Sequence, residues 1–217
     1  MFQKLIFLLL LLGLGTKSYS IGWYPARTID RGVNSFAVFK PGTNSSNIYI
    51  VTESLAGAFR KNQPNQAIIK IFQISGSAIR SSTVARVTLD ASPTPFPLHP
   101  RVAAFSSQVL VTWQETSYER GGTAIKYAYS PSGINSFSAP QNLPGTEPGK
   151  TSILPVVSVD DKGKFQVYFQ QEQDVARFTL MQSIGERGVF AEPRAIVKGI
   201  QFIGRGVFFP TVVFRNQ

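Results

Sequence analysis

The sequence predicts a secreted, all-β protein built from a repeating unit of about 55 residues. Its composition, with 18 Gly, 14 Pro and 17 Phe, is typical of short strands joined by turns. After the first twenty residues, no stretch shows sustained helical periodicity. Pro100, Pro155 and Pro210 stand 55 residues apart, and each opens a short apolar segment. Proline is acceptable at the first residue of a strand, so these positions mark the starts of three equivalent strands.

Two units, 97–144 and 152–197, carry the repeat most clearly. Each continues with a second strand (108–115 and 164–172), a third strand (123–130 and 176–183), and a turn with a short fourth strand (130–143 and 183–196). In the closing segments a Ser, a Phe, a Pro and a final aliphatic residue recur at an interval of 53 residues. Residues 34–90 are a more divergent copy, with strand candidates at 35–39, 47–53, 67–75 and 84–89.

Four antiparallel strands in such a unit form one blade of a β-propeller, whose faces are buried by stacking on neighbouring blades. We therefore expect a β-propeller over 21–217, with three blades and a partial one at 206–217. The alternative is a β-sandwich in which the proline spacing is a coincidence. A closed ring needs about four to eight blades. Three explanations stay open: a truncated product, a ring completed by two or more chains, or a closing blade made from residues 21–30 and 210–215.

The first twenty residues have the pattern of a secretory signal peptide. A basic start at residues 1–4 precedes an apolar run over 5–15, and Ser18 and Ser20 supply the small residues read at a cleavage site. The run is short for a membrane anchor, which is the alternative. We expect cleavage near Ser20, a secreted product, extracellular or periplasmic, and no stable membrane insertion. Removing Lys4 and Lys17 lowers the formal net charge from +10 to +8.

The composition excludes several kinds of chemistry. There is no cysteine, which rules out disulfides, thiolate metal sites and cysteine nucleophiles. His99 is the only histidine, so a zinc site with several histidines is impossible. Asp160 and Asp161 fit a hairpin turn better than a calcium site. We expect neither a metal nor a cofactor. The positive charge favours anionic glycans as binding partners, although a contribution to solubility alone also explains it. Because the basic residues are scattered along the chain, we expect no nucleic acid as a partner.

The order of motifs resembles the sialidase (neuraminidase) superfamily. Its Asp-box, or BNR-like repeat, reads Ser-x-Asp-x-Gly-x-Thr-Trp and precedes a short fourth strand. Ser130 and Phe137 fit its first and last positions, as do Ser183 and Phe190. Ser132 and Gly185 stand where Asp belongs, and Ile134 and Arg187 where Gly belongs. The resemblance implies a propeller. The arginine clamp, the Tyr–Glu nucleophile pair and the acid/base Asp of the family's enzymes are not matched residue by residue.

Two residues are candidates for ligand binding. Arg101 opens a strand that would line the central channel, where a guanidinium can bind an anionic sugar. Trp113 could stack on a sugar ring, or else pack inside the blade. We expect a non-catalytic propeller that binds carbohydrate or protein. The chain could be a truncated product, and its open sheet edges could pair with another copy. The alternative is an exo-α-sialidase-type glycoside hydrolase or a fragment of one. Catalytic residues stay unassigned.

Overall fold

The structure is a computed structural model that describes residues 29–42, 45–92, 97–117, 121–147, 149–174 and 177–201. The described residues form thirteen β-strands and no helix, which confirms the all-β prediction. All strands belong to one compact unit that begins at Gly32. No helix among these residues could span a membrane. The predicted signal peptide at 1–20 and the partial unit at 206–217 lie outside the described residues.

Sheet 1 is an antiparallel meander in chain order. Its strands are β1 (Val33–Phe39), β2 (Asn47–Leu55), β3 (Asn65–Ser75) and β4 (Ala78–Leu89). Ser75 pairs with Ala78, so β3 and β4 are joined by a two-residue turn in which Gly76 has φ +57°. Glycine takes this conformation without a Cβ clash, which is why such hairpin turns favour it. The sheet covers the predicted unit 34–90, and β4 is longer than the predicted closing segment.

Sheet 2 repeats the meander. Its strands are β5 (Arg101–Phe105), β6 (Gln108–Thr116), β7 (Thr123–Ser130) and β8 (Gln141–Asn142). Every residue of β6 from Val109 to Gln114 is buried. A strand with both faces covered reads as a continuous apolar run instead of an alternating one. The sheet therefore needs a neighbour on each side.

Sheet 3 has the same order with a divided last strand. Its strands are β9 (Ser152–Val159), β10 (Phe165–Asp174), β11 (Arg177–Glu186), β12 (Val189–Phe190) and β13 (Arg194–Gln201). Both β12 and β13 pair with β11, at different parts of its length. β11 continues to Glu186, into the segment predicted as a turn, because Gly185 and Glu186 still pair with β12.

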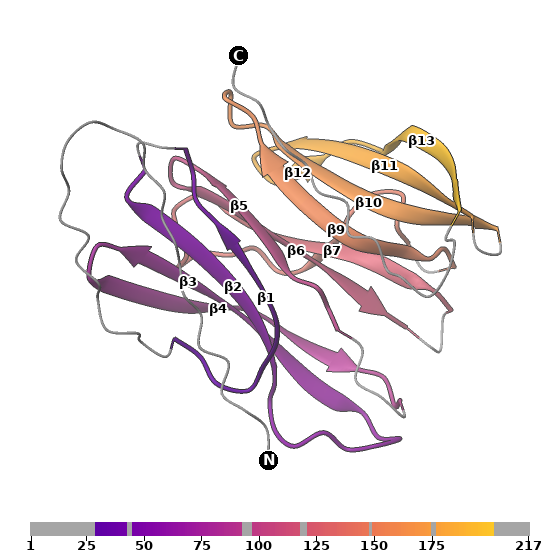
Figure 1. The fold of residues 1–217 in the computed structure, drawn as a ribbon, viewed down its shortest axis with the longest axis horizontal. Helices are drawn as coiled ribbons and strands as arrows, with labels where there is room; N and C mark the ends of the chain where they lie inside the picture. Colours follow the sequence, from indigo (N-terminus) through magenta and orange to yellow (C-terminus); the bar gives the residue numbers. More distant parts are fainter. Residues whose placement is uncertain are drawn as a thin grey trace. The chain divides into compact units, whose positions relative to one another are not determined.

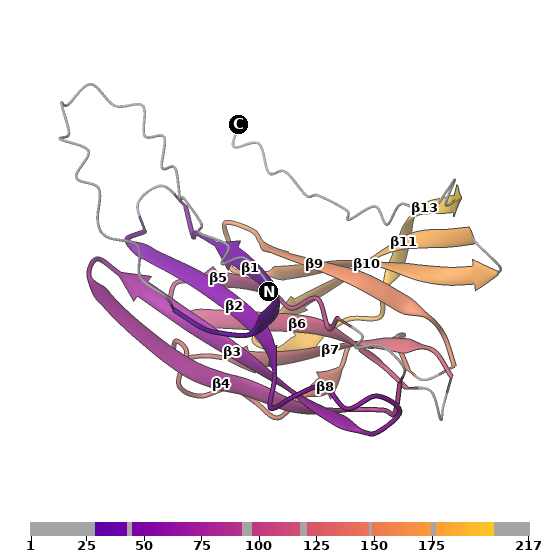
Figure 2. The ribbon, with the colours of Figure 1, turned by 60° about the horizontal axis from the view of Figure 1, so that its bottom comes forward.

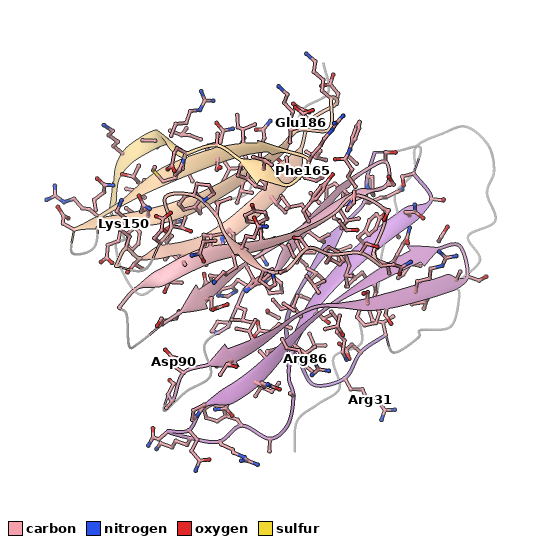
Figure 3. All side chains as sticks on the ribbon, turned by 180° about the vertical axis from the view of Figure 1, so that it is seen from behind. Arg31, Arg86, Asp90, Lys150, Phe165 and Glu186 are labelled. Atoms are coloured by element: carbon pink, nitrogen blue, oxygen red, sulfur yellow. The ribbon has the colours of Figure 1, made fainter. Side chains whose placement is uncertain are left out.

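The three sheets pack face to face in chain order (Figures 1 and 2). One core cluster lies between sheets 1 and 2 and contains Val51, Ile69, Val111 and Trp113 among others. A second lies between sheets 2 and 3, where Figure 3 labels Phe165. The first strands are neighbours, since β5 contacts both β1 and β9. The described strands do not close into a barrel or a ring.

Aromatic rings of sheet 2 meet glycines of sheet 3 at close range. A Cβ added to Gly163, which has φ +81°, would lie 2.7 Å from the Phe105 ring. A Cβ on Gly188, with φ +80°, would lie 2.8 Å from the Tyr129 ring. The Tyr127 hydroxyl also donates to the Gly188 carbonyl at 3.0 Å. These glycines therefore serve both the turn and the approach of one sheet to the next.

Candidate functional site

The best-defined polar cluster lies where one sheet connects to the next. Both first strands carry a residue followed by proline near their start: His99-Pro100 directly precedes β5, and Leu154-Pro155 lies inside β9, which begins at Ser152. Both preceding residues are left-handed, with φ +49° at His99 and +57° at Leu154. This conformation costs a side-chain-bearing residue about 1–2 kcal/mol. Such strain persists only where the surroundings hold the backbone in place.

Glu53 holds the first of these junctions. It stands near the end of β2, and its side chain is 1% exposed. Oε2 accepts the backbone N–H of Leu98 at 2.8 Å and the Ser35 hydroxyl at 2.6 Å. Burial raises the pKa of Glu53, and the hydrogen bonds from Ser35, Leu98, Asn34 and His99 oppose that rise in part. The carboxyl group thus connects β1, β2 and the start of sheet 2.

Gln114 does the same at the second junction with a neutral side chain. It is 8% exposed, and its Oε1 accepts the backbone N–H of Leu154 at 2.9 Å. Its Nε2 donates to the Pro97 carbonyl at 3.2 Å. Glu53 and Gln114 are each the seventh residue of their strand. Because an amide replaces the carboxylate at the equivalent place, the shared role is to bind backbone, and it needs no charge.

Sequence reasoning missed both residues. Glu53 is a charged residue in a segment, 48–55, whose other residues are apolar or carry a hydroxyl group, and charged groups are rarely buried without partners. That was the available signal. Gln114 gave none by itself, since Trp-Gln near a strand end fits an exposed amide equally well.

Arg101 lies beside the first junction, at the first residue of β5. It is half-buried, and Nη1 donates to the carbonyl of Pro100 at 3.0 Å. Burial lowers the pKa of Arg101, but an arginine keeps its charge at any physiological pH. Burial and, secondarily, the charge of Arg101 lower the pKa of His99. At neutral pH the junction therefore holds a positive guanidinium beside a neutral imidazole.

Trp113 is fully buried, at 0% exposure, in the core between sheets 1 and 2. Its indole N–H has no hydrogen-bond partner. A sugar ring has no access to it in this structure, because the apolar side chains of sheet 1 already cover its face. Along β5, Val102 faces sheet 1 and Ala103 faces sheet 3, so Arg101 is on the opposite side of sheet 2 from Trp113. The structure does not bring the two predicted ligand-binding residues together.

The remaining polar features are local. Asp160 Oδ1 accepts the backbone N–H groups of Lys162 at 3.0 Å and Lys164 at 2.8 Å, which is the bonding of a hairpin turn. Within the described ranges, no group of three or more metal-ligating side chains converges. The loop between β2 and β3 forms an open cleft. Its lining is Leu55, Ala56, Gly57, Ala58, Arg60, Pro64, Asn65 and Gln66. Arg60 is its one charged side chain, so the cleft lacks groups for acid–base chemistry.

Comparisons with known proteins give no relative. No protein-family model, no curated protein and no solved structure matches this chain. The function is therefore inferred from the repeat and from the residues described above.

Proposed function

We propose that this protein is a secreted, non-catalytic β-propeller of the sialidase-like type, or part of one, that binds an acidic carbohydrate or a protein. The observation that carries the proposal is the stack of three antiparallel sheets, two of four strands and one of five, with neighbouring first strands. Consecutive blades of a propeller stack in this way, which is why the stack supports the proposal. Fold alone does not define an activity.

The two closing turns support the sialidase-like assignment. Ser130 and Ser183, the first positions of the degenerate boxes, are both fully buried. Ser130 Oγ accepts the N–H of Ser132 at 3.4 Å, and Ser183 Oγ donates to the Ala191 carbonyl at 2.6 Å. The aromatic at the last position packs into a core cluster shared with the preceding sheet: Phe137 does so in sheet 2 and Phe190 in sheet 3. The turns thus have equivalent structural roles.

The ligand class follows from charge. Arg101 is a half-buried guanidinium at the start of a first strand, and such a group binds a carboxylate through two parallel hydrogen bonds. The formal net charge, +10 for the whole chain and +8 without residues 1–20, favours encounter with acidic ligands. The buried carboxyl group of Glu53 is already bonded to Leu98 and Ser35, so it is a poor candidate for a glycosidase acid.

A glycan array with acidic and neutral sugars tests the proposal. We expect the pure protein to bind acidic glycans, and Arg101→Gln to weaken that binding about tenfold. Arg86→Gln is the matched control, because exposed Arg86 on β4 carries the same charge outside the first strands (Figure 3). An array without signal, together with no bound protein partner, would refute the binding function. Turnover of a fluorogenic sialoside between pH 4 and 8 would instead favour the hydrolase alternative.

A further inference from the structure

A continuous network of polar side chains crosses three neighbouring strands of sheet 3. Arg194 of β13 donates from Nε to Oε1 of Gln182 on β11 at 2.9 Å. Gln182 Nε2 donates to Gln166 Oε1 and to the Tyr168 hydroxyl, which are both on β10 and both 2.9 Å away. The Tyr168 hydroxyl in turn donates to Gln166 Oε1 at 2.5 Å. These bonds hold the four side chains of the polar network in one arrangement.

The polar network lies on the outer face of sheet 3, which is turned away from sheet 2. Phe165 and Val167 of β10 belong to the core shared with sheet 2. Because side chains alternate along a strand, Gln166 and Tyr168 point to the opposite face. Both are half-buried, whereas Arg194 is exposed. A ligand in solution can therefore reach the network at its arginine end.

The orientation of the two amide groups follows from the arginine. A guanidinium can only donate, so the atom of Gln182 that faces Arg194 is the oxygen. The nitrogen of Gln182 then faces Gln166, and the facing atom of Gln166 must also be an oxygen. Both amide oxygens are thus engaged inside the network. The groups left without a hydrogen-bond partner among the described residues are donors, namely the two Nη groups of Arg194 and Nε2 of Gln166.

An independent observation beside Gln166 also points to a ligand. Ser158 of β9 pairs with Gln166, so its side chain lies on the same outer face. It is 6% exposed, and within the described ranges its Oγ has no hydrogen-bond partner. Such orphaned hydroxyl groups are uncommon, because an unsatisfied buried polar group costs about 1–3 kcal/mol. Half-buried Val156 and Ile184 flank the polar groups, and ligand sites commonly combine a few polar groups with apolar neighbours.

We propose that the polar network binds a carboxylate of an acidic oligosaccharide. The groups it offers are donors, so the ligand must supply acceptors, and the charge of Arg194 favours an anion. With Nε held by Gln182, the two Nη groups of Arg194 remain for a bidentate pair with a carboxylate. Gln166 Nε2 donates to an oxygen of the same ligand.

The size of the network favours a ligand longer than one sugar ring. β13, β11, β10 and β9 are consecutive neighbours, so Arg194 and Ser158 are separated by three strand spacings of about 4.8 Å each, or about 14 Å at the backbone. This site rests on the proposed function, because it assumes an acidic glycan as the ligand. It is separate from Arg101, which stands on β5 of sheet 2.

An NMR titration of the full chain with a hyaluronan tetrasaccharide, which carries glucuronate, tests the site. We expect the Arg194 Nε–H signal and the Gln166 side-chain amide signals to shift on binding. The neutral chitin tetrasaccharide should shift neither. Arg194→Gln should weaken binding about tenfold, because it removes a charge-assisted pair. Arg86→Gln is the matched control, since it removes the same charge from an exposed position on sheet 1, and it should leave the affinity nearly unchanged.

Gln166→Glu is the sharper variant. Its carboxylate still accepts the hydrogen bonds from Gln182 and Tyr168, but it presents an oxygen where Gln166 presents Nε2. A purely structural network would tolerate this change. A network that binds a carboxylate would not, because an acceptor then faces an acceptor, and we expect the affinity to fall at least about tenfold.

Three results would overturn the site. The first is that the Arg194 and Gln166 signals stay fixed at about 10 mM tetrasaccharide, well above the Kd of a millimolar site. The second is a Gln166→Glu protein that binds as tightly as the unchanged one. The third is binding that is lost in Arg101→Gln but not in Arg194→Gln, which would refute this site and support the proposed function. The absence of binding to any acidic glycan would refute both.

Discussion

Replacing Gln114 by leucine tests the junction between sheets 2 and 3 directly. Leucine has nearly the same volume, but it cannot accept the Leu154 N–H at 2.9 Å or donate to the Pro97 carbonyl at 3.2 Å. Leaving the buried N–H without a partner costs about 1–3 kcal/mol, and the lost bond to Pro97 adds about 1 kcal/mol. Burying the leucine side chain returns part of this. We expect a net loss of about 2–3 kcal/mol in the free energy of unfolding.

Thermal and urea unfolding would measure the loss. In a chain of this size, about 2–3 kcal/mol lowers Tm by roughly 5–10 °C. Gln173→Leu, an exposed control on β10, should stay within about 0.5 kcal/mol of the unchanged protein. Gln114→Glu should recover part of the loss, because a carboxylate still accepts the Leu154 N–H as Glu53 accepts that of Leu98. A Gln114→Leu protein as stable as the control would refute the reasoning.

Three further predictions concern stability. Because burial raises the pKa of Glu53, the folded protein holds this proton more tightly than the unfolded chain, so the free energy of unfolding should fall as pH rises from the ordinary range of a glutamate through the raised pKa. Calorimetry should show that Glu53→Gln flattens this fall, and an unchanged slope would contradict the prediction. Gly163→Ala should lower the free energy of unfolding in urea by about 2–4 kcal/mol, because its backbone is left-handed and the new Cβ would lie 2.7 Å from Phe105. Gly76→Ala, which has open space around it, should lower it by only about 1 kcal/mol. Equal losses in the two variants would show that contact between sheets is not the cause. Trp113→Ala should lower the free energy of unfolding by about 3–5 kcal/mol, but Trp113→Phe should stay within about 1 kcal/mol of the unchanged protein, since it removes an indole N–H without a partner. Strong quenching of Trp113 fluorescence by acrylamide, measured in a Trp23→Phe background, would contradict its burial.

The sequence was sufficient for the period and the strand order, because both depend on local chemistry. Pro100 directly precedes β5, the first strand of sheet 2, and Pro155 lies within β9, the first strand of sheet 3. The turn at Asp160 is the predicted hairpin. Strand lengths near the closing turns were less predictable. Gly185 and Glu186 pair with β12 through backbone atoms that the side-chain pattern does not reveal.

The direction in which each side chain points could not be read from the sequence. In β6 both faces are buried, so the alternation that normally separates inside from outside is missing, and the sequence left Trp113 open as a sugar platform beside the commoner role of a packed core residue. The left-handed backbone at His99 and Leu154 was equally hidden. A residue before proline is biased toward extended conformations, and here a side chain of the preceding sheet binds the backbone beside His99 and at Leu154.

Stacking of successive sheets is the central claim, and NMR nuclear Overhauser effects between aromatic rings test it most directly. Tyr127 of sheet 2 and Phe190 of sheet 3 have ring centroids 4.9 Å apart, and Tyr129 and Phe165 have centroids 6.2 Å apart. We predict cross-peaks between the ring protons of both pairs. Rings that show cross-peaks only to residues of their own sheet would contradict the stack.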